Sequence, residues 1–398
     1  MRYFRNKKNM WIFCSIVLVN ISCLSGCMSV TKGEQEKNSS WESQIEALKN
    51  DAPGKEGGRI EGQASEEITF QAEVKIPSDM QEYKVTKLRM KRHRYDRERV
   101  KKAWEEYCKG QKVIKEHNRS DTDEYLENGE EEQSYELEFA DGPSVMIRDS
   151  RILVSNGEKT DKRNALISLS EYGNSFGLEY ASQRDLDFIS VKEADKIIRD
   201  LYKKCGIDNI LEYKEYYTAG IEELEKAKEA LGEEYEKWTA PELKNPEVTK
   251  EDEMYWFAYY QGYEEIPFVT YSMKEEETKS GITSGVEHNL HVCYGRDGIV
   301  NFDGVPSYKV EQCLEKEDIL SLGEISDLFV QEKNKDILTV DLRVNGIELA
   351  YLPVLVDGSN FIYETVPLWC VLYERYDETF KHDVEEYVIY DARDGRRL

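Results

Sequence analysis

The sequence predicts an α+β fold in which antiparallel sheets are each covered by helices. Runs of alternating apolar residues, many of them among the 26 tyrosines, indicate strands. Segments with apolar residues three and four positions apart, bounded by capping residues, indicate helices. A helix followed by long strands occurs twice in the second half of the chain, which predicts a duplicated helix-plus-strands unit. A disordered tether is expected to precede these domains.

The N-terminal segment has the pattern of a secretory signal. Basic residues without any acid stand among the first nine residues, and an apolar run from Trp11 to Val19 follows. A membrane-spanning helix needs roughly 20 apolar residues. The apolar segment as a whole is interrupted by Asn20 and ends before Gly26, so it is too short to span a membrane. We therefore expect a cleaved signal rather than an uncleaved anchor.

The end of this segment, Leu24-Ser25-Gly26-Cys27, resembles the lipobox of bacterial lipoproteins. The resemblance implies cleavage between Gly26 and Cys27 and diacylation of the Cys27 thiol. Each buried CH₂ contributes about 0.8 kcal/mol, so two acyl chains hold a protein on a membrane where one holds it only marginally. We expect a protein on the outer face of the cell membrane, anchored through a diacylglyceryl cysteine. A plain secretory signal is the alternative.

The net charge excludes one class of partner. The whole chain has a formal net charge of −26, and removal of residues 1–26 would make the mature chain still more negative. Nucleic acid binding needs concentrated Lys and Arg, and an anionic leaflet repels an acidic protein. We therefore expect no nucleic acid partner, and a membrane attachment that depends on the lipid.

Composition divides the chain into a tether and folded parts. The stretch after Cys27 is rich in Lys, Glu, Ser and Gly, which predicts a flexible linker in which 41–50 forms a helical turn or two. The predicted ranges are a signal peptide at 1–26, a lipid-anchored linker at 27–66, an N-terminal α+β domain at 67–187, and helix-plus-antiparallel-sheet units at 188–305 and 306–398.

The N-terminal domain begins with two alternating segments, at 68–76 and 81–92, and we expect them to pair as a hairpin that turns near Ser78-Asp79. Asp96 is a candidate N-cap of a helix that stops near Gly110. Further strands are predicted at 135–140, 145–154 and 164–170.

The helix that begins at Ser190 has the strongest signals in the chain. Ser190 and Glu193 form a capping box, and Gly206 ends the helix. The later helices are predicted at 221–237 and 317–333, and the strands at 210–217, 254–263, 266–272, 289–302, 338–354, 364–376 and 384–398.

The segments HVCYGRDGIVNF at 291–302 and VIYDARDGRRL at 388–398 resemble PepSY-type and YycH/YycI-type modules, whose strands end in Asp-Gly turns. Residues 67–398 are also similar to a family of uncharacterised lipoproteins from Gram-positive anaerobes. This similarity depends on EITFQAEVKIP at 67–77, Tyr95-Asp96, Pro367-x-Trp369 and Asp391-Ala392. Asp391 and Arg393 stand where such relatives have apolar residues, which predicts a more exposed last turn. The family has no assigned catalytic residue, so the resemblance transfers only the acylation of Cys27.

Motifs for catalysis are scarce. The sequence contains no nucleophile elbow, no HExxH and no Gly-rich phosphate loop. Ser29 and Lys32 have the spacing of a penicillin-binding pair, but a tether cannot preorganise them. His288 and His291 would face opposite sides of a strand, so metal chelation is not expected. We predict no catalytic residue, no metal and no cofactor.

Five cysteines remain after the signal and the acylated residue are set aside: Cys108, Cys205, Cys293, Cys313 and Cys370. Their wide spacing contains no CxxC motif, which argues against a zinc or redox site. We expect buried free thiols, and Cys293 with Cys313 is the expected pair if one disulfide forms.

An acidic stretch at 121–138 contains nine carboxylates. Clustered oxygens suit calcium, but Tyr125 occupies a ligand place of the EF-hand pattern and the turn glycine is missing. A solvated acidic loop is therefore the preferred interpretation, and a calcium site is the alternative.

A basic stretch between Lys84 and Lys102 contains ten Lys or Arg and two acids. One interpretation is internal compensation by the acids at 121–138. The other is a binding patch for an anionic surface, such as lipid headgroups, wall polymers or an acidic partner loop. The candidate binding residues are Lys87, Arg89, Lys91, Arg92 and Arg94.

These observations favour a lipid-anchored, non-enzymatic protein of the bacterial cell envelope that binds another protein or a wall component. The resemblance to YycH and YycI suggests modulation of a membrane sensor as one version. A cell-wall or peptide-processing enzyme, with a site assembled from distant residues, is the alternative, and solute capture is a third possibility.

Overall fold

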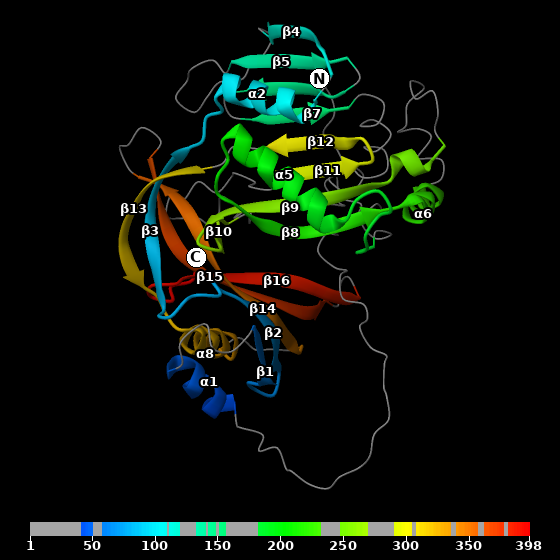
Figure 1. Cartoon of the computed structure of the whole chain (residues 1–398). Helices are drawn as coiled ribbons and strands as arrows, with labels where there is room; N and C mark the ends of the chain where they lie inside the picture. Colours follow the sequence, from blue (N-terminus) through cyan, green and yellow to red (C-terminus); the bar gives the residue numbers. More distant parts are fainter. Residues whose placement is uncertain are drawn as a thin grey trace, which may run out of the picture. The chain divides into compact units, whose positions relative to one another are not determined.

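The computed structural model has a mixed α+β fold, rich in strands, with two sheets (Figure 1). This confirms the predicted fold class at the level of its secondary structure. The structure describes residues 41–50, 58–109, 111–119, 133–140, 142–148, 151–156, 182–231, 247–269, 290–304, 308–335, 340–356, 362–377 and 381–398.

The seven-stranded sheet combines strands from both ends of the chain. Its order is β1-β2-β14-β15-β3-β13, and β16 pairs with β15. β2 and β14 run parallel, so this sheet is mixed rather than purely antiparallel as we expected. Its strands are β1 (Arg59–Gln63), β2 (Ile68–Lys75), β3 (Lys84–Arg92), β13 (Tyr308–Asp318), β14 (Leu342–Leu355), β15 (Ile362–Asp377) and β16 (His382–Asp391).

The nine-stranded sheet is built from the middle of the chain. Its order is β10-β9-β11-β12-β7-β6-β5-β4, and β8 pairs with β9. The pairs are antiparallel, as predicted. Its strands are β4 (Val113–Arg119), β5 (Ser134–Phe139), β6 (Ser144–Arg148), β7 (Ile152–Ser155), β8 (Ile210–Ala219), β9 (Met254–Tyr263), β10 (Ile266–Pro267), β11 (Leu290–Gly295) and β12 (Gly298–Gly304).

Capping residues mark the helix ends. The Asp96 carboxylate accepts from the Arg99 N–H, and Ser190 with Glu193 forms the predicted capping box. Gly206 ends its helix in the left-handed conformation, as its position predicted. The described helices are α1 (Trp41–Asn50), α2 (Arg97–Tyr107), α5 (Val191–Cys205), α6 (Ile221–Leu231), α8 (Leu322–Lys333) and the 3₁₀ turn η1 (Lys250–Asp252).

The chain forms two compact units. Unit 1 contains the described residues of Thr86–Glu315 and Tyr351–Val366. Unit 2 contains those of Cys14–Val85, Lys316–Ala350 and Pro367–Leu398. β3, β13, β14 and β15 each contribute residues to both units. Each unit has its own layer of helices on a sheet, so each can be described separately.

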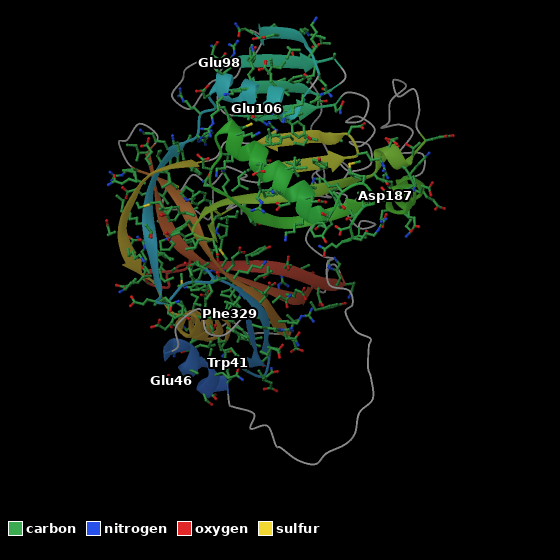
Figure 2. The ribbon with its side chains drawn as sticks, viewed as in Figure 1. Trp41, Glu46, Glu98, Glu106, Asp187 and Phe329 are labelled. Carbon is green, nitrogen blue, oxygen red and sulfur yellow. The ribbon has the colours of Figure 1, made fainter. Side chains whose placement is uncertain are left out.

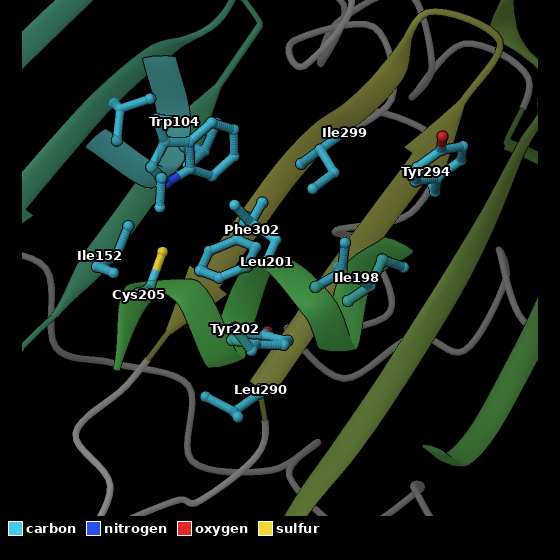
Figure 3. Packing of buried hydrophobic residues seen from close by; sticks show 14 of the residues in the cluster. Trp104, Ile152, Ile198, Leu201, Tyr202, Cys205, Leu290, Tyr294, Ile299 and Phe302 are labelled. Atoms are coloured by element: carbon cyan, nitrogen blue, oxygen red, sulfur yellow. The ribbon is translucent and has the colours of Figure 1, made fainter. Parts of the chain in front are cut away.

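The core of unit 1 lies between α2, α5 and one face of the nine-stranded sheet (Figure 3). Trp104 of α2, Tyr202 of α5 and Phe302 of β12 are fully buried. The Tyr202 and Phe302 rings lie 4.4 Å apart, and Trp104 meets Phe302 edge-on at 5.7 Å. Aromatic pairs of this kind stabilise a core beyond the area that they bury.

The core of unit 2 lies between α1, α8 and one face of its strands. Trp41 of α1 packs on Phe70 of β2 with ring centroids 4.5 Å apart, and Phe70 meets Phe329 of α8. Phe329 in turn contacts Tyr373 of β15. Figure 2 labels Trp41 and Phe329 in this layer. One face of the unit 2 sheet is therefore covered by helices.

Two expectations for the N-terminal part need correction. Residues 41–50 and 59–63 fall within the range predicted as a flexible linker, yet they form α1 and β1 because Trp41 and Ile45 pack on the unit 2 core. The predicted hairpin between 68–76 and 81–92 is wrong: β14 and β15 lie between β2 and β3 in the sheet. A local turn cannot reveal such an insertion from the far end of the chain.

Other boundaries also differ. The predicted strand 145–154 is the β6–β7 hairpin, and the predicted helix 317–333 begins only at Leu322, after Ser321 caps it. β4 and β13 were not predicted, because their polar sequences lack an alternating apolar pattern. The predicted strand at 164–170 lies outside the described residues.

Candidate functional site

Several predicted site residues lie outside the described ranges. They are Gly26 and Cys27 of the lipobox, Ser29 and Lys32, His288, and residues 121–132 of the acidic stretch. Cleavage before Cys27 and its acylation stay predictions. Along the part of the chain that the structure describes, no helix is long and apolar enough to cross a membrane.

The basic stretch on β3 is paired with acids of unit 1. The Lys87 Nζ lies 3.0 Å from Glu364 Oε2 on β15, and the Arg89 Nη2 lies 2.6 Å from Glu364 Oε1. These two cations hold the pKa of Glu364 below its usual value, with Arg89 contributing most. Lys91 pairs with Glu311 of β13 at 2.9 Å. Arg92 and Arg94 also interact with neighbouring groups.

The rest of the basic stretch supports α2 and α5. Arg97 lies over the Tyr135 ring, with its guanidinium carbon 3.5 Å from the ring centroid. Arg99 donates to the Lys203 and Lys204 carbonyls at the C-terminus of α5, where a cation is favoured by the helix dipole. Much of this positive charge is therefore engaged within unit 1, by acids of β13 and β15 and by a helix end.

The described end of the acidic stretch and His291 lie on strands. Glu136 and Glu138 lie on β5, where they pair with His117 and Lys115 of β4. His291 lies on β11, as predicted, and its ring is 4.9 Å from that of Trp256. In the residues that can be described, no group of His, Cys, Asp and Glu side chains could hold a metal ion.

The five cysteines are free thiols. The hypothesised Cys293–Cys313 disulfide is therefore wrong: Cys293 is buried on β11, and the exposed Cys313 on β13 lies 3.1 Å from the Tyr263 hydroxyl. Burial raises the pKa of Cys108 to about 11 and that of Cys205 to about 12. These two thiols stay protonated near neutral pH and are poor nucleophiles.

The helix-covered face of unit 2 holds a buried polar network. Lys333 Nζ of α8 donates to the Tyr373 hydroxyl at 2.9 Å, and Tyr373 donates to Glu386. Arg375 Nε also donates to Glu386, at 2.8 Å. Burial raises the pKa of Tyr373, and its hydrogen bond to Glu386 acts in the same direction. The network fixes α8 on β15 and β16, since each member would be costly to leave unpaired.

The other face of β15 and β16 presents a different set of side chains. Successive residues of a strand point to opposite faces, and Tyr373 and Glu386 face the helices. The alternate positions therefore face away from α8. We call this set the tyrosine–carboxylate face; it consists of Leu372, Glu374, Tyr376, Asp383, Glu385 and Tyr387.

The strand register orders this face into three rows. Leu372 stands opposite Tyr387, Glu374 opposite Glu385, and Tyr376 opposite Asp383. Two opposed carboxylates are thus flanked along the hairpin by a tyrosine on either side. Because alternate residues of a strand are about 7 Å apart, the two tyrosines are separated by roughly 13 Å along the hairpin.

The tyrosines of this face are exposed. Tyr376 is 39% exposed and Tyr387 is 37% exposed, and they are among the large apolar side chains that stand out from the described surface. Arg343 of β14 pairs with Glu374 and lies 3.9 Å from an oxygen of Asp383. Glu374 and Asp383 thus both lie near this guanidinium.

Both strands were predicted from the sequence, but this face was not. The signal was the alternation of Tyr with Glu in LYERYD at 372–377 and in the VEEY stretch at 384–387. That alternation shows that one side of each strand is polar and aromatic. It cannot show that the two sides coincide, because this depends on the register of β15 against β16.

The C-terminal residues on which the resemblance depends, Pro367, Trp369, Asp391 and Ala392, lie close together in unit 2. Ala392 N–H donates to the Pro367 carbonyl at 2.9 Å, and Trp369 is fully buried. Arg393 and Asp394 of the last turn are exposed, as expected, but Asp391 is only 1% exposed, so the expectation is wrong for that residue. Its carboxylate is offset by Arg393, whose Nη2 lies 2.6 Å away.

Comparisons with known proteins give a fold and no activity. The sequence matches no family model, and the search of curated proteins found no match. The structure is similar to the crystal structure of an uncharacterized protein from Eubacterium rectale, with a TM-score of 0.67 and 19% sequence identity. The match covers 90% of this chain and 98% of that chain, so the two proteins share their fold over most of their length.

Proposed function

We propose that the chain is a protein anchored by lipid to the outer face of the cell membrane. It acts by binding a neighbouring protein of the cell envelope through the tyrosine–carboxylate face. The observation that carries the proposal is the pair of exposed tyrosines beside opposed carboxylates on the helix-free side of β15 and β16. Tyrosine is enriched in protein interfaces because its ring buries apolar area while its hydroxyl keeps a polar contact.

The energetics of this face support a binding role. Like charges that stand directly opposite each other destabilise a sheet, and Glu374 and Glu385 are in that arrangement. The opposite side of the same strands shows the contrasting case, where Glu386 is paired with Arg375 and Tyr373. Arg343, which pairs with Glu374, offsets part of this repulsion, and a partner that brings further positive charge would add to that offset.

The anchor belongs to the same proposal. Leu24-Ser25-Gly26-Cys27 supports cleavage and diacylation, which would place the folded units outside the cytoplasm. The mature protein is expected to begin at an acylated Cys27, and its mass should match that chain. Mass spectrometry that finds residues 1–26 attached and an unmodified Cys27 thiol contradicts the anchor.

The resemblance to lipoproteins of Gram-positive anaerobes and to YycH/YycI modules supports a more specific version. α5 and α8 both begin with a Ser-x-x-Glu capping box and both precede antiparallel strands, which supports a duplicated unit. In this version the bound neighbour is a membrane sensor that the protein modulates.

The binding role is tested by native electrophoresis of membranes solubilised in a mild neutral detergent. The wild-type chain is expected in a complex larger than its own monomer. Tyr376→Ser with Tyr387→Ser is expected to release the monomer while the protein stays on the membrane. A complex that survives this double substitution contradicts the role of the tyrosine–carboxylate face.

A further inference from the structure

We infer that α1 is a releasable clamp that sets how far the folded units can move from the lipid anchor. While α1 is docked on unit 2, the tether from Cys27 ends at Trp41. Once α1 is released, the tether ends only at Arg59, where β1 begins. This inference rests on the anchor of the proposed function, and it concerns the reach of the protein rather than its partner.

α1 is held on unit 2 by one side of the helix and lies beside α8 (Figure 1). Trp41 packs on Phe70 of β2 with ring centroids 4.5 Å apart. Ile45 is only 4% exposed, and the Lys49 Nζ lies 3.0 Å from Asp327 Oδ2 of α8. The three α1 residues are four positions apart, so they share one face of the helix. Docking therefore depends on two apolar side chains and one ion pair.

Two glycines shape the surface on which α1 docks. A Cβ at Gly323 of α8 would lie 2.6 Å from the Ile45 carbonyl oxygen. A Cβ at Gly62 of β1 would lie 3.1 Å from the Trp41 ring. Because both positions lack a side chain, α1 approaches α8 and β1 closely. Surfaces packed in this way have discrete arrangements rather than continuous ones, so α1 is either docked here or released.

α1 can leave this surface while the rest of unit 2 stays folded. α1 has 10 residues, fewer than the roughly 12–15 that an isolated helix needs, so its helical form depends on docking. Trp41 is only partly buried, and the side chains of Lys49 and Asp327 are 30% and 36% exposed. Ion pairs with this exposure contribute little. An N-terminal element with so few buried groups opens at a lower free energy than the strands of the core.

Release of α1 changes the length of the tether. A chain spans at most about 3.5 Å per residue. From Cys27 to Trp41 this limit is about 50 Å, and from Cys27 to Arg59 it is about 110 Å. The tyrosine–carboxylate face belongs to unit 2, so its distance from the membrane is limited by the same tether. With α1 docked, the protein meets partners near the bilayer, and release roughly doubles the range.

Pulling on single molecules with optical tweezers tests the release directly. The mature chain from Cys27 to Leu398 retains every residue that the structure describes. One handle is coupled in vitro to the Cys27 thiol, in a Cys313→Ser background that leaves the other described thiols buried, and the second handle follows Leu398. We expect a first extension step of roughly 50–60 Å at low force, before unit 2 unfolds, because the end of the tether moves from Trp41 to Arg59.

Matched variants show whether this step is the release of α1. Trp41→Ser removes the ring that packs on Phe70, so the ratio of released to docked molecules should rise at least about tenfold. The force at which the rest of unit 2 unfolds should stay as in the wild type. Gly346→Ala, whose Cβ would meet nothing closer than 3.5 Å, is the control and should leave the ratio within about twofold.

Two results would overturn the inference: a single rupture in which α1 leaves together with the core of unit 2, or a first step that Trp41→Ser and Gly346→Ala change equally. Either result leaves the proposed function standing, because the handle on Cys27 is coupled in vitro and the natural anchor is tested separately by mass spectrometry. An unmodified Cys27 with residues 1–26 attached contradicts the anchor and the membrane range, whereas the step still establishes that α1 is released.

Discussion

Glu374 of β15 and Glu385 of β16 stand directly opposite each other on the helix-free face of unit 2. Arg343 pairs with Glu374, and the exposed rings of Tyr376 and Tyr387 lie one row away on either side. On the helix-covered face of the same hairpin, the polar side chains form a closed network around Tyr373. The two faces of one hairpin thus carry different polar groups: a network around Tyr373 on one, and opposed carboxylates between exposed tyrosines on the other.

Removal of one of the opposed carboxylates is expected to stabilise the protein. Glu385→Gln should raise the free energy of unfolding by about 0.5 kcal/mol, because like charges directly opposite in a sheet repel. Urea unfolding measures this change, and Glu66→Gln, an exposed acid off the face, should leave the stability unaltered. A loss of stability in Glu385→Gln would show that the fold depends on this carboxylate.

The buried network predicts the opposite effect on the other face. Tyr373→Phe removes the hydroxyl that accepts from Lys333 and donates to Glu386. Lys333 and Glu386 keep other contacts, so the change measures the loss of these two hydrogen bonds to charged groups, which should cost about 1–3 kcal/mol in urea unfolding. The matched control is Tyr376→Phe on the exposed face, where a change within about 0.5 kcal/mol is expected. Equal effects of the two substitutions would argue against a structural role for the network.

α1 and α8 approach each other so closely that we expect the addition of a single methyl group to push them apart. A Cβ at Gly323 would lie 2.6 Å from the Ile45 carbonyl oxygen and 2.7 Å from the Lys49 nitrogen, both backbone atoms that cannot move aside alone. Gly323→Ala should therefore loosen α1, which hydrogen exchange at 41–50 detects as faster exchange. Gly346→Ala meets nothing closer than 3.5 Å and should leave that exchange rate unchanged. Unaltered exchange in Gly323→Ala would mean that α1 does not pack there.

His93 predicts a pH dependence of stability. Burial first, and then the nearby charges of Lys309 and Arg99, lower the pKa of His93 to about 4, against a smaller opposing effect of Asp208. The unfolded chain binds the proton near pH 6.5, so it is favoured as the pH falls from about 6.5 toward 4. Linkage gives a loss of about 2 kcal/mol between pH 7 and pH 5.

His93→Asn removes the titrating group and should flatten this dependence. Urea unfolding at pH 7 and pH 5 measures the difference between the two proteins. His382 is exposed on β16, and His382→Asn is the matched control that should keep the wild-type slope. The same slope in His93→Asn and the wild type would show that other groups produce the acid sensitivity.

Local signals made part of the fold predictable. α5 was found because its capping box and the terminal glycine stand within the helix's own sequence. β9 was found because its sequence is a run of aromatic residues, which favour strands. The ends of such elements are determined by residues within or next to them, and distant parts of the chain do not alter these ends.

The remaining features depend on partners far away in sequence. β2 lies beside β14, so the assumption that neighbouring segments pair failed there. β13 is an edge strand with mostly exposed side chains, and nothing in Glu311 to Glu315 marks it as a strand. The tyrosine–carboxylate face exists only through the register of β15 on β16, which no single segment encodes.

The most direct measurement of the central claim is site-specific photo-crosslinking in intact cells of the native host, with a photoreactive residue in place of Tyr376 in the full chain. The account predicts an adduct with an envelope protein. That adduct should disappear in the Tyr387→Ser background, and a probe in place of the exposed Glu98 on α2 should not form it. The same adduct from both positions, or no protein adduct from position 376, would contradict the account.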